Sequence, residues 1–171
     1  MKIQIMKNKI LIFLVPFILL CSQVNANTPK SIGKFKNWQS FVLVKDSEKI
    51  CFAQTIPSKR EPGAFKRNDS RLFVTFRPNE NIIDEVSITS GHQYKPSSVS
   101  ASSGKRKFSF FSQDNFAWLL DNKEEKKFIK LMKRATNLIV VANATNGTRT
   151  KDHYSMMGFT KAYNAAKQNC N

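Results

Sequence analysis

The C-terminal stretch NGTRTKDHYSMMGFTKAYNAAKQNC, residues 146–170, contains two different periodicities and ends on a cysteine. Its first part, TRTKDHYSM (148–156), alternates in the manner of a half-buried β-strand. In its second part, helical spacing follows Gly158. We therefore expect a strand and then a C-terminal helix, over about residues 159–170. One side of that helix should face the body of the protein, and this side carries Phe159, Ala162, Tyr163, Ala166 and Cys170.

The segment before this stretch has the pattern of the partner strand in a hairpin. NLIVVANAT (137–145) is apolar and rich in β-branched residues, and it leads directly into Asn146-Gly147. An Asn-Gly pair between two strands is typical of a type I′ turn, in which both residues have positive φ. We expect such a turn at residues 146–147.

Alternation of period two continues toward the N-terminus. It is present in residues 38–44, 49–55, 71–77, 84–89 and 107–112, which are separated by Gly, Pro, Asn and Ser. Roughly seven or eight antiparallel strands in one domain favour a β-sandwich or a barrel. Trp38 and Trp118 are expected in the core. The Pro- and Gly-containing stretch 57–70 is expected to be an exposed loop.

One internal segment has helical spacing instead. DNKEEKKFIKLMKRA (121–135) places Phe128, Ile129 and Met132 on one face. Asp121 followed three residues later by Glu124 resembles a capping box, and the basic C-terminal end suits the helix dipole. We expect a helix over about residues 122–135.

The first 26 residues have the pattern of a cleaved signal peptide. A lysine-bearing start is followed by an apolar run over residues 10–21 and by small residues before Ala26. The run is about twelve residues long and a membrane span needs about twenty. We expect a cleaved leader (1–26), a lead-in (27–34) and one domain (35–171), with no transmembrane span after cleavage. An uncleaved anchor, or a lipid anchor on Cys21, is the alternative.

Two of the three cysteines, Cys51 and Cys170, would remain after cleavage. In an exported protein a small, even number of cysteines indicates a disulfide, because the compartment is oxidising. Cys170 lies on the inner side of the expected C-terminal helix, and Cys51 lies in the expected strand 49–55. We predict that they are bonded to each other. Two unpaired buried thiols are the alternative.

The chain is strongly basic, with 28 Lys and Arg against 12 Asp and Glu. The leader takes three Lys, which leaves 25 against 12 and a net charge of +13. A field of this sign attracts phosphates, lipopolysaccharide, anionic lipids or acidic glycans. A compositional origin of the lysine excess is the alternative. The candidate contacts lie at a hairpin tip and on the internal helix: Lys105, Arg106, Lys107, Lys126, Lys127, Lys130, Lys133 and Arg134.

The sequence gives little support for catalysis. A Ser/His/Asp hydrolase could be drawn from Ser155, His153 and Asp152, but neighbours in a strand point to opposite faces. The other histidine, His92, lies in an expected turn, and no group of residues has metal-ligand spacing. We therefore expect no catalytic residues, no metal and no cofactor. The sequence also lacks the nucleic-acid-binding motifs in which aromatic residues are interleaved with basic ones, so nucleic acid is not an expected partner.

Four stretches together resemble one known family. They are FKNW with ICFAQTIPSK (within 35–59), residues 73–98, FSFFSQDNFAWLLD (108–121) and residues 131–170. In this order they are similar to the invasion-associated locus B family of exported bacterial proteins, found mainly in alphaproteobacteria. The resemblance implies an immunoglobulin-like antiparallel β-sandwich, export, and in some pathogens a link to entry into host cells. It implies no catalytic residues.

The sequence as a whole predicts a mainly β, exported binding protein of the periplasm, outer envelope or secreted fraction. Its partner would be an unidentified protein or an anionic component of the envelope or of a host surface. Two alternatives from other classes remain. One is a small periplasmic hydrolase, and the other is a structural envelope protein that its charge holds to anionic surfaces.

Overall fold

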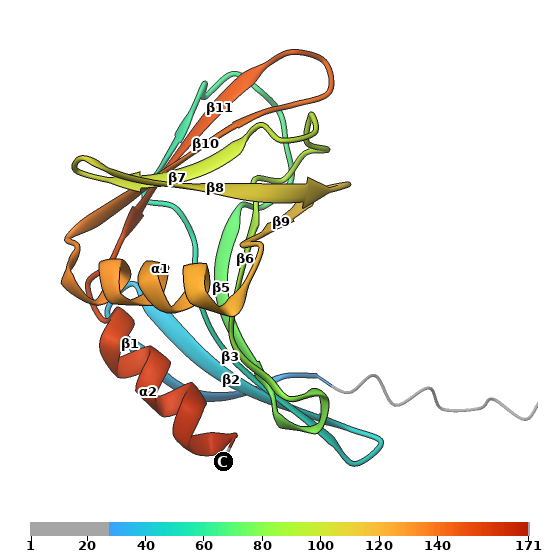
Figure 1. The fold of residues 1–171 in the computed structure, drawn as a ribbon, viewed down its shortest axis with the longest axis vertical. Coiled ribbons are helices and arrows are strands. Elements are labelled where there is room, and N and C mark those ends of the chain that lie inside the picture. Colours follow the sequence, from blue (N-terminus) through green and yellow to red (C-terminus); the bar gives the residue numbers. More distant parts are fainter. Residues whose placement is uncertain (1–27, 171) are drawn as a thin grey trace, which may run out of the picture.

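The computed structural model describes residues 28–170 (Figure 1). The expected signal peptide and Cys21 lie outside the described residues. The strands are β1 (Lys30–Phe35), β2 (Trp38–Lys45), β3 (Glu48–Thr55), β4 (Lys59–Glu61), β5 (Arg71–Arg77), β6 (Ile82–Thr89), β7 (Val99–Ser103), β8 (Arg106–Gln113), β9 (Phe116–Trp118), β10 (Asn137–Asn143) and β11 (Arg149–Ser155). The helices are α1 (Asn122–Arg134) and α2 (Phe159–Asn169), with a short 3₁₀ turn at Pro78–Glu80.

The strands are hydrogen bonded in one antiparallel order, β1-β2-β3-β5-β6-β9-β8-β7-β10-β11-β4. The short strand β9 pairs with β6 on one side and with β8 on the other, so it joins the two halves of the sheet. Figure 1 shows β1, β2, β3, β5 and β6 in the lower half and β7, β8, β10 and β11 in the upper half. Helix α2 packs on the lower half and α1 lies against β6 and α2. The predicted fold class, mainly β with two helices, is confirmed.

Every predicted strand is present, and four further strands were not predicted. Strand β1 begins within the expected lead-in and pairs with β2, so residues 30–34 belong to the sheet. Strands β4 and β9 have only three residues each, and β7 is rich in serine. These strands lack the length or the β-branched residues that make a strand visible in a sequence.

The predicted type I′ turn at Asn146-Gly147 is wrong. Gly147 has φ of 87°, but Asn146 is not among the residues with positive φ. The loop is longer than a two-residue turn, because β10 ends at Asn143 and β11 begins at Arg149. At the base of this loop, the backbone N–H of Ala144 donates to Thr148 O over 2.8 Å.

The core is one continuous cluster shared by both halves of the sheet and both helices. Trp38 is fully buried, its Nε1 donates to Ser155 O over 3.0 Å, and its ring lies 4.8 Å from that of Phe159. Ser40 Oγ donates to Ala162 O over 2.7 Å, which joins β2 to α2. Trp118, expected in the core, is only half-buried, because Ala117 takes the inward position of β9.

Helix α2 begins where the sequence predicted it and buries the predicted side. Gly158, its N-cap, has φ of 95°, and a Cβ there would collide with Phe35 O. Only glycine combines this backbone conformation with so close an approach of another strand. The start of α2 is therefore set against the turn that follows β1.

Helix α1 buries the predicted residues Phe128, Ile129 and Met132. Asp121 Oδ1 accepts hydrogen bonds from the backbone N–H groups of Lys123 and Glu124, each over 2.8 Å. Glu124 does not complete the expected capping box, since its Oε1 accepts a 2.7 Å bond from Lys127 Nζ instead. Asp121 alone caps this helix.

Glu125 is the buried acidic residue of α1, with 6 % of its surface exposed. Its Oε1 accepts a 3.2 Å hydrogen bond from Val86 N of β6. Burial is the main cause that raises the pKa of this carboxyl to about 7, and the nearby Glu85 and Asp84 add to it. The carboxyl is therefore protonated more readily in the folded protein than in the unfolded chain.

This difference predicts a pH-dependent stability that Glu125→Gln removes. A raised carboxyl pKa means that the folded state binds the proton more tightly, so the free energy of unfolding falls as pH rises from 4.5 to about 7. The neutral glutamine keeps an acceptor for Val86 and has no charge to bury. We expect the variant to be more stable than the native protein by up to about 3 kcal/mol near pH 8, and to differ little near pH 4. Thermal unfolding at several pH values measures this, and a difference that does not change with pH would contradict it.

Candidate functional site

The predicted disulfide is present. Cys51 of β3 and Cys170, at the C-terminal end of α2, are bonded with their Cα atoms 5.7 Å apart. Both residues are buried. The bridge connects the end of α2 to the centre of the lower half-sheet. Such a bond is typical of proteins that fold in an oxidising compartment.

Ser155, His153 and Asp152 do not form a catalytic triad. Asp152 is buried, and its two carboxylate oxygens accept hydrogen bonds of 2.8 and 2.6 Å from the guanidinium of Arg67. His153 lies on the other face of β11, where its Nε2 is 3.1 Å from Glu61 Oε1. This is the opposite-face arrangement that strand geometry predicts for neighbours.

The prediction that residues 57–70 form an exposed loop is wrong at strand β4 and at Arg67. Residues 59–61 of this stretch are strand β4, and the side chain of Arg67 is only 2 % exposed. Besides Asp152, its Nη1 donates to Ser70 Oγ over 3.0 Å and to Ser90 O over 2.7 Å. No local sequence pattern indicates such a partnership, because Arg67 and Asp152 are 85 residues apart.

The side chain of His92 is held by contacts within the protein. Its Nε2 lies 2.9 Å from Thr150 Oγ1 and its Nδ1 lies 3.0 Å from Gln93 O, while its ring packs edge-on against Tyr94. Burial lowers the pKa of this imidazole. Within residues 28–170, no three His, Cys, Asp or Glu side chains are grouped as metal ligands. The same part of the chain contains no helix of sufficient length and apolarity to cross a membrane.

The predicted basic residues lie on two neighbouring elements. Lys105, Arg106 and Lys107 are exposed at the β7–β8 turn. Helix α1 packs against β8, with the ring of Phe128 5.0 Å from that of Phe108. In Figure 1 the β7–β8 turn and the C-terminal end of α1 lie on the same side. Among the described residues, no salt bridge involves the following exposed side chains: Lys105, Arg106, Lys107, Lys126, Lys130 and Arg134.

Two of the predicted basic residues are engaged within the protein. Lys127 pairs with Glu124 over 2.7 Å. Lys133 Nζ lies 3.9 Å from the centre of the Tyr163 ring, a cation–π contact between the two helices. Burial, together with the nearby Lys167, lowers the pKa of Lys133. Tyr163 in turn donates to Asp84 Oδ1 over 2.6 Å, so Lys133 is part of the helix packing.

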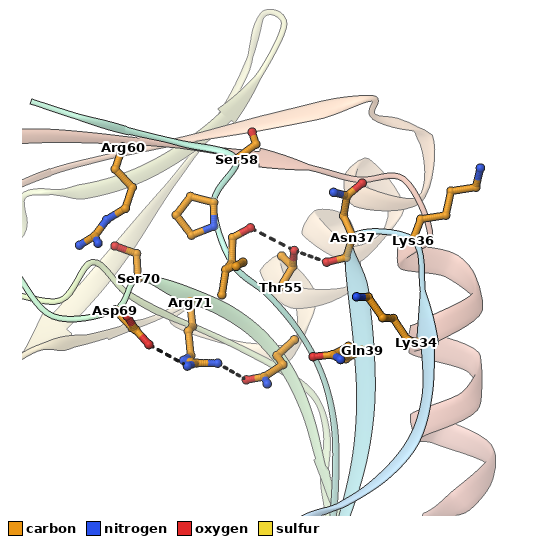
Figure 2. A pocket seen from close by; sticks show the side chains of 13 residues that line it. Lys34, Lys36, Asn37, Gln39, Thr55, Ser58, Arg60, Asp69, Ser70 and Arg71 are labelled. Carbon is orange, nitrogen blue, oxygen red and sulfur yellow. Dashed lines mark hydrogen bonds and ion pairs between the residues drawn. The ribbon is translucent and has the colours of Figure 1, made fainter. Parts of the chain in front are cut away.

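A polar pocket that the sequence did not indicate lies on the outer face of the lower half-sheet (Figure 2). Its volume is about 520 Å³. Three stretches of the chain, within 34–39, 54–60 and 69–71, line it: Lys34, Lys36, Asn37, Gln39, Gln54, Thr55, Ile56, Pro57, Ser58, Arg60, Asp69, Ser70 and Arg71. These residues meet through strand pairing, so no local sequence pattern indicates the pocket.

The pocket is positively charged. Its lining includes the basic residues Lys34, Lys36, Arg60 and Arg71 but only one acidic residue, Asp69. Arg71 Nη2 donates to Asp69 Oδ2 over 2.9 Å, and its Nη1 is 3.4 Å from Gln54 Oε1. Figure 2 shows Lys34 and Arg71 on opposite sides of the pocket, while Lys36 points away from it. An arrangement of this kind can hold an anionic group between a lysine and an arginine.

Comparison with solved structures supports the fold. The crystal structure of invasion-associated protein B from Bartonella henselae matches with a TM-score of 0.56 and 12 % sequence identity. The match covers 82 % of this chain and 96 % of that chain. This chain shares its fold with invasion-associated protein B. At this identity the likeness concerns the fold alone.

Comparison of the sequence itself with known proteins identifies no relative. No protein-family model and no curated protein matches the chain. The support for the fold expected from the resemblance comes from the structural match. The neighbour's name associates that protein with invasion.

Proposed function

We propose that the protein is an exported binding protein of the invasion-associated locus B type, which adsorbs to anionic surfaces of the bacterial envelope or of a host cell. The observation that carries this proposal is the group of exposed basic side chains at the β7–β8 turn, Lys105, Arg106 and Lys107, which have no acidic partner among residues 28–170. Lys126, Lys130 and Arg134 extend the same charge over α1.

Three further observations support export and binding. The first 26 residues have the pattern of a cleaved leader. The disulfide between Cys51 and Cys170 suits an oxidising compartment. The fold is shared with a protein whose name associates it with invasion. Placement in the periplasm, outer envelope or secreted fraction, and a role in host contact, are parts of this proposal.

Reversing the charge of the β7–β8 turn should reduce adsorption. We expect the triple variant Lys105→Glu, Arg106→Glu, Lys107→Glu to bind vesicles of phosphatidylglycerol and phosphatidylcholine more weakly than the native protein. Binding of the native protein should weaken steeply between about 0.1 M and 1 M salt, because the Debye length shrinks from about 10 to about 3 Å. Vesicle co-sedimentation measures both effects.

A matched control separates local contact from total charge. Lys30, Lys45 and Lys49 lie on β1, β2 and β3 near the β2–β3 turn, away from the β7–β8 turn in Figure 1. Replacing these three by Glu changes the net charge by the same amount. If this control variant loses as much adsorption as the first variant, the β7–β8 turn has no special role and the proposal is wrong in that respect.

A further inference from the structure

The pocket of Figure 2 is built on a polar row that crosses the strands of the lower half-sheet. Lys34 of β1 is paired with Gln39 of β2, and Gln39 is paired with Gln54 of β3. Residues directly opposite each other in an antiparallel pair project on the same face, with Cβ atoms about 5 Å apart. On β5 the residue opposite Gln54 is Phe73, and Arg71, two residues away on the same face, reaches Gln54 Oε1 over 3.4 Å. Two cationic side chains therefore flank two side-chain amides.

Two of the three side-chain amides that line the pocket, Asn37 and Gln39, are available to a ligand, while Gln54 is in contact with Arg71. Within residues 28–170, no hydrogen bond uses the side-chain amide of Asn37 or of Gln39. An amide presents a donor and an acceptor side by side, and a hydroxyl group also donates and accepts. Neighbouring hydroxyls on one ligand suit this arrangement better than a simple anion does, because an anion can only accept.

The remaining walls restrict the ligand class further. Ile56, which is 61 % exposed, and Pro57 provide an apolar edge. The lining contains no aromatic residue, so nucleobases would have no ring to stack on. The volume of about 520 Å³ lies within the usual range of small-molecule sites, about 300–1,000 Å³. It is larger than a single carboxylate or phosphate group requires.

We propose that this pocket binds an acidic oligosaccharide. The Lys34 ammonium and the Arg71 guanidinium would pair with its carboxylates, and the amides of Gln39 and Asn37 would pair with its hydroxyls. Ile56 and Pro57 would contact the apolar face of a sugar ring. Asp69, whose side chain is 76 % exposed, competes with the ligand carboxylate for Arg71. This site is separate from the basic surface at the β7–β8 turn.

Calorimetric titration of the oxidised mature protein with trigalacturonate tests the proposal. We expect saturable binding, with no binding of maltotriose, which has the hydroxyls without the carboxylates. Citrate, which has the carboxylates without the sugar ring, should bind more weakly. Lys34→Gln and Arg71→Gln should each weaken trigalacturonate binding by about tenfold, the usual cost of losing one charge-assisted hydrogen bond. Asp69→Asn should strengthen it, because Arg71 would lose its competing partner.

Two outcomes would overturn the proposal. One is trigalacturonate binding that Lys34→Gln and Arg71→Gln leave unchanged, or no binding at all. The other is citrate binding as tight as that of trigalacturonate, which would indicate a site for charge alone. The variant with Glu at 105, 106 and 107 should bind trigalacturonate like the native protein. Its loss of vesicle adsorption therefore tests the proposed function, while the Lys34 and Arg71 variants test the pocket.

Discussion

Replacing Asp152 by Asn should lower the free energy of unfolding by about 3–5 kcal/mol, the usual cost of breaking a buried ion pair from one side. The side chains of Arg67 and Asp152 are 2 % and 1 % exposed, and they make two parallel hydrogen bonds. The variant would leave the Arg67 guanidinium buried without a counter-charge. Urea unfolding, followed by circular dichroism, measures the loss.

A second bidentate pair in the same protein serves as the control. Arg77 donates to both carboxylate oxygens of Glu85 over 3.0 and 2.9 Å, but each of these side chains is 22 % exposed. Water screens such a pair, so Glu85→Gln should cost only about 1 kcal/mol or less. Both substitutions remove a carboxylate from a bidentate pair with arginine. They differ in burial, and Arg77 also keeps a 3.1 Å ion pair with Glu80. Equal losses in the two variants would contradict the role assigned to burial.

The size of the expected effect follows from what Arg67 connects. It binds Asp152 on β11, Ser70 just before β5 and the carbonyl of Ser90 just after β6. Strand β11 belongs to the upper half of the sheet, and β5 and β6 belong to the lower half. Loss of the Asp152 charge would leave one buried guanidinium to be solvated by water entering between the halves. We therefore expect Asp152→Asn to destabilise the whole fold and not only the β4–β5 connection.

The sequence predicted those parts of the fold in which side-chain periodicity is local. The buried side of α2 repeats within eleven residues, and the strand Arg71–Arg77 is apolar and β-branched along its length, so both were found. Strand β7, with the sequence VSASS, is held by its neighbours β8 and β10, and only Val99 among its own residues favours a strand. Short strands of this kind depend on pairing that a linear pattern does not contain.

The candidate site was harder to predict for the same reason. Lys105, Arg106 and Lys107 are adjacent in the sequence, so the basic turn was visible. Lys34 and Arg71 line the same pocket only because β1, β2, β3 and β5 are paired in a particular register. The opposite error occurred at Lys133, which was grouped with its basic neighbours although its position on α1 places it over Tyr163. Net charge is a property of the sequence, but the partner of each charge is a property of the fold.

Removing the disulfide with Cys51→Ala and Cys170→Ala should lower the free energy of unfolding by about 2–5 kcal/mol, the usual range for a native bridge in a small secreted domain. The two cysteines are 119 residues apart, so the bridge restricts nearly the whole unfolded domain. For this loop length the chain-entropy model gives about 5 kcal/mol, which is the upper end of the range. At about 2–4 °C per kcal/mol, the melting temperature should fall by several degrees or more.

The position of the bridge also predicts where the protein opens first. Phe159 and Ala162 hold the start of α2 through contacts with Trp38 and Ser40, but the end of the helix is held at Cys170. Without the bridge, the last turn of α2 should lose protection against hydrogen exchange before β2 and β3 do, because helix ends fray unless they are tied down. The native protein, reduced with dithiothreitol, should show the same melting temperature and the same exchange pattern as the double variant. An unchanged melting temperature in both samples would mean that packing of Phe159, Tyr163 and Ala166 is sufficient to hold α2 against the sheet.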